Sequence, residues 1–230
     1  MKKLVMGAGI LMLFAAAVLI TACSDRSADS VQNKKEQRLV LGAHEDFKGS
    51  QEAGTLVFDS LTVLDSERKV QPAAIESWTV NKDSTEFVLH LRKGLSYSDG
   101  TAASAEDLKK SIEVLGKAQF RSYMSKLDHI DIIDKTSVKV VMKSPFLFLV
   151  DELEKIQLIP AKFLQEDGSI TEYIGSGPYL LKEYEKDVKA VLVKNPTYWD
   201  KKPYKMETLI WQVIPDGEAR KLALQSGQVD

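Results

Sequence analysis

The chain has few cysteine and histidine side chains, the residue types that most often bind metal ions. The sequence has a single cysteine, Cys23, and three histidines. One of them, His44, precedes Glu45 and Asp46, and these three side chains could contact a metal ion. A metal cage would need a second histidine one helical turn away or a cysteine partner, and this segment has neither. We therefore predict no metal site at His44, and keep it as a candidate ligand contact.

The other two histidines give no stronger signal. His129 lies beside Asp128 and Asp131, again without further candidate metal ligands. His90 falls on the polar face of a predicted strand, where we expect it to be exposed to solvent. The sequence thus predicts no resident metal ion and no cofactor.

The sequence also lacks the arrangements that are typical of enzyme active sites. It has no Gly-rich phosphate loop, no Ser-His-Asp set with a nucleophile elbow and no Cys-His pair. Asp99 and Asp107 are interpreted as turn and helix-start residues, and their spacing does not make them a catalytic pair. We predict that the chain is not an enzyme; the alternative of a surface hydrolase would need such a centre.

The first 22 residues resemble a lipoprotein signal peptide. Lys2 and Lys3 precede an uncharged apolar run over residues 4–20, which ends in the sequence Leu-Ile-Thr-Ala-Cys. This ending resembles the bacterial lipobox, in which the chain is cut before the cysteine and the cysteine receives a lipid. A lone cysteine cannot form a disulfide within the chain, so lipid attachment gives Cys23 a role. The alternative is an uncleaved membrane anchor with an incidental cysteine.

Residues 23–37 are polar and are predicted to form a disordered tether. The mature protein would then be extracytoplasmic and anchored to the cell membrane by the lipid on Cys23. The whole chain has 31 basic and 33 acidic residues, a formal charge of −2, and removal of Lys2 and Lys3 would make it −4. Such a balance offers no basic surface for nucleic acid.

The elements that position the candidate residues are clearest over residues 85–112. Phe87, Leu89 and Leu91 alternate with more polar residues, which predicts a strand with one face on a core. A glycine-containing turn follows, and Ser104 is typical of a helix N-cap. We therefore predict a strand, a tight turn and a capped helix.

The remaining elements alternate along the chain. Strands are predicted over residues 38–43, 130–133, 137–142, 179–184, 189–194 and 208–214. Helices are predicted over residues 54–64, 71–78, 161–165 and 218–224, and a further one is predicted to begin at Pro145. Polar residues 44–50 form a loop at the carboxyl end of the first strand, a position that often carries ligand contacts. Residues 38–230 are thus predicted to form an α/β unit with a mixed sheet.

Six sequence motifs carry a resemblance to a known family. In chain order they read QPAAIESW, EFVLHLRKGL, YSDGT with SAEDL, IGSGPY, KNPTYW, and VIPD continuing to SGQVD at the end of the chain. Together they resemble the extracytoplasmic solute-binding proteins, family 5, of peptide and nickel ABC importers. The resemblance covers residues 39–230.

The resemblance implies a fold and a division of the chain. Residues 38–230 would form the N-terminal lobe of a type II periplasmic-binding-protein-like fold of the peptide/nickel-binding class, with a mixed sheet, and the second lobe would be missing. Family members enclose their ligand between two lobes by hinge closure. We therefore expect either a truncated product or a second chain that supplies the other lobe.

The resemblance also points to Arg121 and Tyr123 as ligand-binding residues. Nickel-type members place an arginine and an aromatic residue at this position against an anionic metal chelate. An arginine suits a carboxylate because its guanidinium donates two parallel hydrogen bonds. The second arginine of such a pocket would fall near residues 153–155, where this chain has none. The alternative for Arg121 is a solvated surface charge.

The function that the resemblance implies is that of a substrate-binding lipoprotein of an ABC importer. Its ligand would be an oligopeptide, a dipeptide or a nickel chelate, with nickel as cargo and not as cofactor, and its partners would be the permease subunits. The alternative is a non-transporting remnant or a surface interaction lipoprotein.

Overall fold

The computed structural model describes residues 37–119, 121–201 and 204–230. The predicted signal peptide, Cys23 and the predicted tether up to residue 36 lie outside the described residues. Gln37 already contacts the first sheet, because its carbonyl accepts hydrogen bonds from the backbone N–H groups of Glu207 and Thr208 at 2.7 and 3.2 Å. None of the helices in the described part of the chain is both long and apolar enough to span a bilayer.

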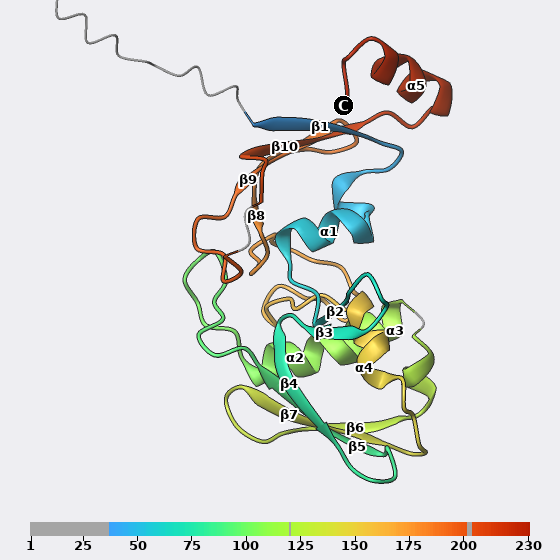
Figure 1. Cartoon of the computed structure of the whole chain (residues 1–230), viewed down its shortest axis with the longest axis vertical. Helices are drawn as coiled ribbons and strands as arrows, with labels where there is room; N and C mark the ends of the chain where they lie inside the picture. Colours follow the sequence, from blue (N-terminus) through green and yellow to red (C-terminus); the bar gives the residue numbers. More distant parts are fainter. Residues whose placement is uncertain (1–36, 120, 202–203) are drawn as a thin grey trace, which may run out of the picture. The chain divides into compact units, whose positions relative to one another are not determined.

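The first sheet joins the beginning of the described chain to its end (Figure 1). Its strand order is β1-β10-β9-β8, with bounds Arg38–Ala43, Thr208–Val213, Lys189–Lys194 and Tyr179–Glu185. β1 pairs with β10 in parallel, whereas the other neighbours are antiparallel. The predicted mixed sheet is therefore confirmed.

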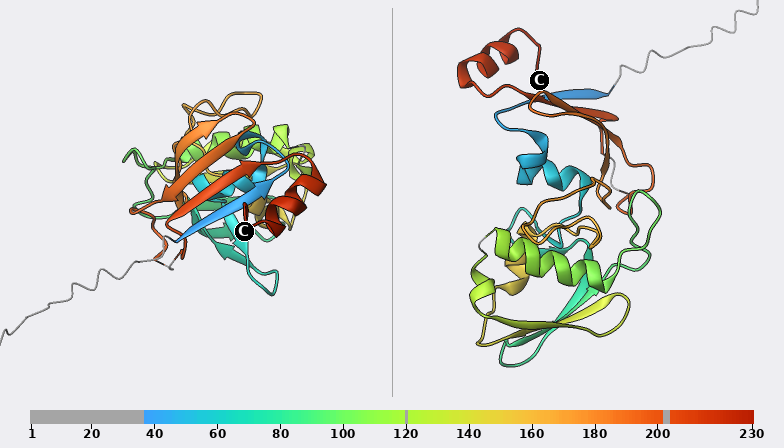
Figure 2. Two further views of the ribbon diagram at one scale, coloured as in Figure 1. Left: turned by 90° about the horizontal axis from the view of Figure 1, so that it is seen from above. Right: turned by 180° about the vertical axis from the view of Figure 1, so that it is seen from behind.

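The second sheet is antiparallel throughout, with strand order β4-β5-β7-β6. The strands are Ile75–Val80, Glu86–Leu91, Ser137–Met142 and Leu127–Ile132. Phe87, Leu89 and Leu91 of β5 are buried, as their alternation predicts. Helix α2 (Ala105–Lys110) covers one face of this sheet and contacts β6 and β7 (Figure 2).

A capping box fixes the start of α2. Ser104 Oγ accepts a hydrogen bond from the Asp107 N–H at 3.3 Å, and Asp107 Oδ2 accepts one from the Ser104 N–H at 2.9 Å. Asp107 Oδ1 also accepts the Ala161 N–H at 2.6 Å. The helix continues as a π-helical turn, η2 (Ser111–Leu115), and then as α3 (Gly116–Ala118). The predicted strand, turn and capped helix are confirmed, and Asp107 has a structural role.

Helix α1 (Gln51–Val57) packs against β8 and leads to the short hairpin of β2 (Thr62–Leu64) and β3 (Val70–Pro72). The Gly-Ser-Gly-Pro run passes directly beside the end of this helix. The Gly177 N–H donates to the Val57 carbonyl at 2.8 Å. A Cβ atom on Gly175 or Gly177 would lie 2.0 or 2.7 Å from that carbonyl oxygen, so the close approach requires glycine at both positions.

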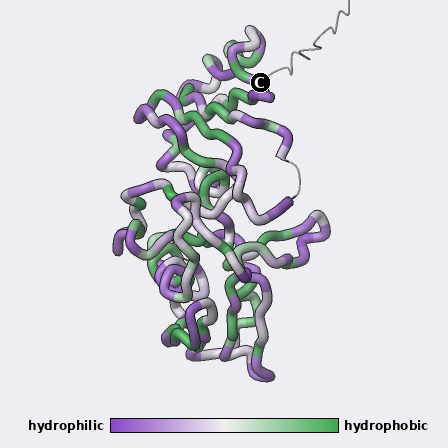
Figure 3. Tube along the Cα trace, turned by 90° about the vertical axis from the view of Figure 1, so that its left-hand side faces the viewer, coloured by the Kyte–Doolittle hydropathy of each residue, from purple (hydrophilic) through white to green (hydrophobic). Residues whose placement is uncertain are grey.

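The other helical segments are short. They are η1 (Phe47–Gly49), η3 (Ser122–Ser125), α4 (Leu149–Glu152), η4 (Leu153–Lys155) and α5 (Gly217–Gln225). One large apolar core runs through both four-stranded sheets, and a second small cluster of Val40, Ala223 and Val229 lies where α5 meets β1. The trace in Figure 3 accordingly alternates between hydrophobic stretches, in green, and hydrophilic ones, in purple.

The helix predicted over residues 71–78 is wrong. Pro72 ends β3, and residues 75–80 form β4, which pairs with β5. A register shift between Ile75 and Ser77 interrupts the alternation of buried and exposed side chains in β4. The period-two pattern of a strand was therefore hidden in the sequence.

Three other helix predictions need correction. The helix predicted over residues 54–64 ends at Val57, and Thr62–Leu64 is strand β2. Residues 161–163 form a turn, and Leu164 pairs with Ile170 in an isolated antiparallel β-bridge, so this segment is not a helix. The helix predicted from Pro145 begins only at Leu149.

His90 was predicted to be exposed, but the structure shows it half-buried. Its Nδ1 lies 2.9 Å from Ser137 Oγ across the β5–β7 pair.

Candidate ligand-binding site

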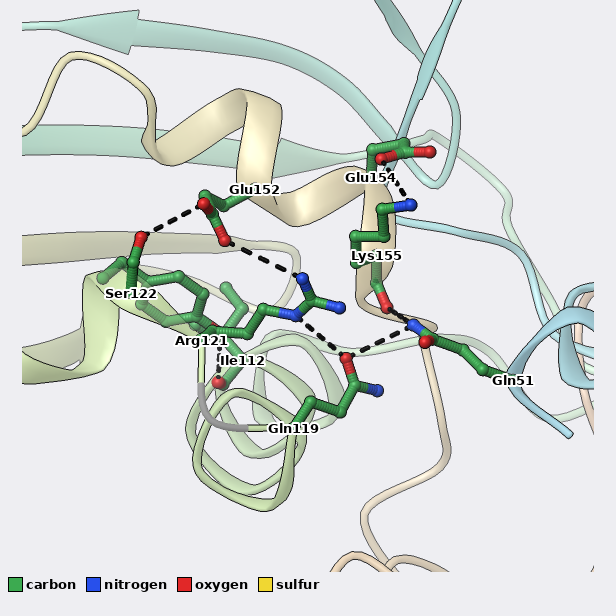
Figure 4. Close-up of polar contacts among 9 residues, drawn as sticks. Gln51, Ile112, Gln119, Arg121, Ser122, Glu152, Glu154 and Lys155 are labelled. Carbon is green, nitrogen blue, oxygen red and sulfur yellow. Dashed lines mark hydrogen bonds and ion pairs between the residues drawn. The ribbon is translucent and has the colours of Figure 1, made fainter. Parts of the chain in front are cut away.

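Arg121 occupies the N-cap position of η3 and is the centre of a group of polar side chains (Figure 4). Its side chain is 21% exposed. Arg121 Nε donates to Gln119 Oε1 at 3.1 Å, and Nη1 lies 4.0 Å from Glu152 Oε2. Nη2 has no hydrogen-bond partner among the described residues, so part of the guanidinium is available to a ligand.

Glu152, at the end of α4, is held loosely against Arg121. The 4.0 Å separation exceeds the 2.7–2.9 Å that is typical of a charge-assisted hydrogen bond. The other carboxylate oxygen, Oε1, accepts a hydrogen bond from Ser122 Oγ at 3.1 Å. A ligand that contacts Arg121 can therefore replace Glu152 without breaking a short ion pair.

Gln51 and Gln119 tie this group to the neighbouring elements. Gln51 Nε2, at the start of α1, donates to the Lys155 carbonyl at 2.8 Å and to Gln119 Oε1 at 3.3 Å. Gln119 Oε1 thus accepts hydrogen bonds from both Gln51 and Arg121 (Figure 4). Neither glutamine nor Glu152 is identifiable from the sequence, because nothing in their spacing distinguishes them from other surface polar residues.

Tyr123, in contrast, lies beneath the site and not on it. Its side chain is fully buried, and its hydroxyl donates to the Ile112 carbonyl at 2.7 Å. Burial raises the pKa of the Tyr123 phenol, which stays protonated as a donor. A Cβ atom on Gly116 would lie 2.2 Å from this hydroxyl, so a glycine is needed there. Tyr123 therefore supports the segment that carries Arg121 and offers a ligand no exposed surface.

His44 stands at the carboxyl end of β1, and its side chain is 67% exposed. Its nearest charged partner is Glu45, with 4.0 Å between Nε2 and Oε2. No hydrogen bond or ion pair between described residues joins His44 to Arg121 or Tyr123. The described ranges also contain no group of three His, Cys, Asp or Glu side chains arranged to hold a metal ion.

The loop that begins at His44 is fixed by Asp46. Asp46 Oδ2 accepts the Tyr184 hydroxyl at 2.7 Å, and Oδ1 accepts the Asp187 N–H at 2.9 Å. Burial alone would raise the pKa of Asp46, but these bonds and the one from the Lys48 N–H hold that pKa below its ordinary value. The loop between His44 and Gln51 is thus anchored to the β8–β9 hairpin by an ionised carboxylate.

A pocket of about 350 Å³ opens beside Arg121. Its charged lining residues are three basic and three acidic ones: Arg68, Arg121, Lys155, Asp151, Glu152 and Glu154. Leu64 and Phe148 add apolar surface, and Phe148 is 66% exposed. This combination of a partly free guanidinium, balancing carboxylates and an exposed aromatic ring suits a small polar ligand.

A larger cavity, of about 810 Å³, lies over Asp59, a residue that no sequence pattern marks. Asp59 accepts hydrogen bonds from the Tyr198 hydroxyl at 2.9 Å and the Trp199 indole N–H at 2.8 Å. Arg92 lies over the Trp199 ring, with its Cζ 3.8 Å from the ring centroid. Burial raises the pKa of Asp59 to about 6, against the effect of these two hydrogen bonds. Tyr198 and Trp199 therefore hydrogen-bond a protein group here.

Comparison with known proteins gives a family match over most of the chain. The model for "bacterial extracellular solute-binding proteins, family 5 Middle" matches residues 69–230. The glutathione-binding protein GsiB of Escherichia coli K12 is 25% identical over 237 residues, covering 99% of this chain and 46% of that protein. The nickel-binding periplasmic protein of the same strain is 24% identical over 188 residues, covering 77% of this chain and 36% of its own length.

The fold is similar to that of solved structures of this type. NikZ from Campylobacter jejuni in complex with Ni(L-His) superposes with a TM-score of 0.74 at 22% identity, over 85% of this chain and 43% of NikZ. The matched 85% of the chain therefore has the fold of part of such a protein. The chain spans about half the length of the curated relatives it matches.

Proposed function

Since the chain belongs to the bacterial extracellular solute-binding proteins of family 5, we propose that it captures a small peptide or a nickel chelate outside the cytoplasmic membrane. One relative is named for glutathione, a peptide, and another for nickel. The ligand would then pass to the permease subunits of an ABC importer.

The observation that carries this proposal is the state of the Arg121 guanidinium. It is partly exposed in a pocket, donates one hydrogen bond to Gln119, and lies 4.0 Å from its nearest carboxylate. A peptide carboxylate or a chelate carboxylate can occupy the free side of this group. We propose Arg121 as a direct ligand contact, Tyr123 as its support and His44 as a further contact on the neighbouring loop.

We also propose that Cys23 carries the lipid that tethers the protein to the outer side of the membrane. The support is the sequence alone: a positive start, an apolar run and a lone cysteine after small residues. The expected product begins at residue 23. Mass spectrometry of the membrane-bound protein would give a diacylglyceryl-modified N-terminal cysteine, whereas a Cys23→Ser variant would keep its signal segment. An unmodified cysteine in the membrane fraction would contradict this part of the proposal.

A thermal-shift screen tests the capture function. The full chain in detergent is heated with di- to pentapeptides, nickel–histidine and other nickel chelates, and at least one should raise the midpoint of unfolding. The shift should disappear in Arg121→Gln. Lys82→Gln, in the exposed β4–β5 turn, is the matched control because it also removes one positive charge, and it should keep the shift. If none of the compounds raises the midpoint of unfolding, ligand capture by this chain alone is excluded.

A further inference from the structure

We propose that a second copy of this chain pairs with the free edge of β6, so that the antiparallel sheets of the two copies join into one continuous sheet. β6 is the last strand in the order β4-β5-β7-β6, and among the described residues it pairs with β7 alone (Figure 1). This inference goes beyond the proposed capture function. Three observations support it: the direction of the β6 backbone groups, the groove beside the strand, and the charges along it.

The first observation is that the backbone groups of β6 alternate between its two sides, as in any antiparallel strand. The Ile133 N–H, directly after β6, donates to the Ser137 carbonyl of β7 at 2.9 Å. By this alternation the N–H and C=O groups of His129 and Asp131 also point toward β7, with which both residues are in register. The N–H and C=O groups of Ile130, between them, point away from β7.

The outward groups belong to Ile130 and Ile132. The Ile130 carbonyl accepts a hydrogen bond from Lys109 Nζ of α2 at 2.8 Å, which confirms its direction. The Lys109 side chain is 37% exposed, and the carbonyl oxygen has a second lone pair that an incoming N–H group can reach. An unpaired strand edge of this kind is a template for the addition of another strand.

The second observation is a groove of about 530 Å³ that Ile132 lines together with residues of the helical segment covering the sheet. Its other apolar lining residues are Val114, on η2, and Met124, on η3. Ile132 and Ile133 are 50% and 53% exposed. An added strand can place an apolar side chain in this groove, and a second β6 supplies Ile132 itself. The remaining lining residues are three lysines and three glutamates, so net charge does not oppose an identical copy.

The third observation is that β6 is complementary to itself. When Ile130 of one copy lies opposite Ile130 of the other, these two residues exchange backbone hydrogen bonds. His129 of each copy then lies opposite Asp131 of the other, and such opposite-charge pairs stabilise neighbouring strands. Both side chains are about half exposed, and within one chain His129 Nε2 already lies 3.4 Å from Asp131 Oδ2. A shift by two residues would place two histidines or two aspartates opposite each other, so the charges favour this register.

Sedimentation of the full chain in detergent tests the inference. Between about 5 and about 500 µM the protein should pass from monomer to dimer. His129→Glu places two carboxylates opposite each other at both ends of the pairing, and it should raise the dissociation constant of the dimer at least about tenfold. Thr79→Glu adds the same charge to an exposed position on β4, the other edge strand of the sheet. It is the matched control and should leave the dimer unchanged.

A mixture of two variants tests the register. Asp131→Lys places a lysine opposite His129 and should also weaken the dimer. In an equimolar mixture of His129→Glu and Asp131→Lys chains, the new carboxylate lies opposite the new ammonium group, so the mixture should dimerise at least as tightly as the wild type. Both substituted side chains are about half exposed, and circular dichroism checks that each variant is folded.

Amide exchange of the wild-type chain needs no variant. The Ile130 N–H should exchange more slowly as the protein concentration rises, because only the dimer pairs it, whereas the Asp131 N–H already faces β7 and should not change. A monomer at every concentration would overturn the inference, as would a dimer that His129→Glu leaves intact or that the mixture does not restore. Slow exchange at Ile130 at every concentration would show that a segment of the same chain covers the edge, and this too would overturn it.

Discussion

The indole N–H of Trp199 donates a hydrogen bond of 2.8 Å to the carboxylate of Asp59, which is 140 residues earlier in the chain. Tyr198 donates to the other carboxylate oxygen at 2.9 Å. Asp59 lies between α1 and β2, whereas the two aromatic residues follow β9. Arg92, after β5, covers the indole ring. The Asp59–Tyr198–Trp199–Arg92 contacts therefore link residues that follow β9 and β5, one strand from each four-stranded sheet, to the α1–β2 segment.

Asp59 should make the stability of the fold depend on pH. Burial raises its pKa in the folded protein from 3.8 to about 6, so the folded state binds the proton more tightly than the unfolded chain does. The free energy of unfolding should therefore fall as the pH rises from about 4 to about 6, by up to about 3 kcal/mol. Denaturant unfolding at a series of pH values measures this slope.

The variant Asp59→Asn should remove the slope. An asparagine does not ionise, but its amide nitrogen takes the place of one of the two oxygens that accept hydrogen bonds from Tyr198 and Trp199. The variant should therefore be about 1–3 kcal/mol less stable at pH 4 and show little further change up to pH 6. Asp83→Asn, in the exposed β4–β5 turn, should keep the wild-type slope. An unchanged slope in Asp59→Asn would show that other groups cause it.

The variant Tyr123→Phe should lower stability without weakening ligand binding. It removes the hydrogen bond to the Ile112 carbonyl, which still accepts the Gly116 N–H. The expected loss is about 1 kcal/mol in the free energy of unfolding. Denaturant unfolding and peptide titration of the same sample check both parts. A loss of affinity at unchanged stability would mean that Tyr123 contacts the ligand directly.

The variant Gly177→Ala should be destabilising by about 1–3 kcal/mol. The added methyl group would lie 2.6 and 2.7 Å from the carbonyl carbon and oxygen of Val57, where backbone atoms cannot move aside easily. Gly49→Ala is the matched control, because a Cβ atom there has no neighbour within 4 Å. Thermal unfolding of both variants makes the comparison, and equal effects would contradict the close approach of the two segments.

The variant Tyr184→Phe should loosen the loop that joins His44 to Gln51. It removes the 2.7 Å hydrogen bond to Asp46 and leaves the ring, over which Lys48 Nζ lies at 4.4 Å. Amide exchange in residues 44–50 should become several-fold faster, since the local opening of the loop becomes less costly. Tyr179→Phe, which removes a hydrogen bond to the Met206 carbonyl at 3.0 Å, serves as the control and should leave this loop unchanged.

The sequence predicted elements best where local pattern and tertiary pairing agree. The alternation of Phe87, Leu89 and Leu91 is preserved in β5 because β5 pairs with β7 in unbroken register and the irregularity of the β4–β5 pair falls in β4. Residues 71–78 were predicted to be helical because an irregularity between Ile75 and Ser77 breaks the alternation of β4. Pairing between distant strands decides that segment, and local propensity does not reveal it.

The candidate site was predictable only in part for a similar reason. Arg121 could be singled out because its type, and the arginine that nickel-type family members place at this position, pointed to an anionic group. Gln119 is only two residues from Arg121, whereas Gln51 and Glu152 come from distant segments that only the fold brings to Gln119 and to the guanidinium. Tyr123 was selected with Arg121 because the resemblance places an aromatic residue beside the arginine, but the chain turns the Tyr123 side chain into the core.

The most direct test of the account is to locate the bound ligand. A ¹⁵N-labelled full chain in detergent is titrated with the free tripeptide Ala-Phe-Ala and followed by NMR. We predict that the largest shift changes occur in the amide signals of Gln119, Arg121 and Lys155 and the side-chain amide of Gln51, with the indole signal of Trp199 unchanged. Saturable changes centred on Trp199 and the Asp59 cavity, or no changes at all, would contradict binding at Arg121.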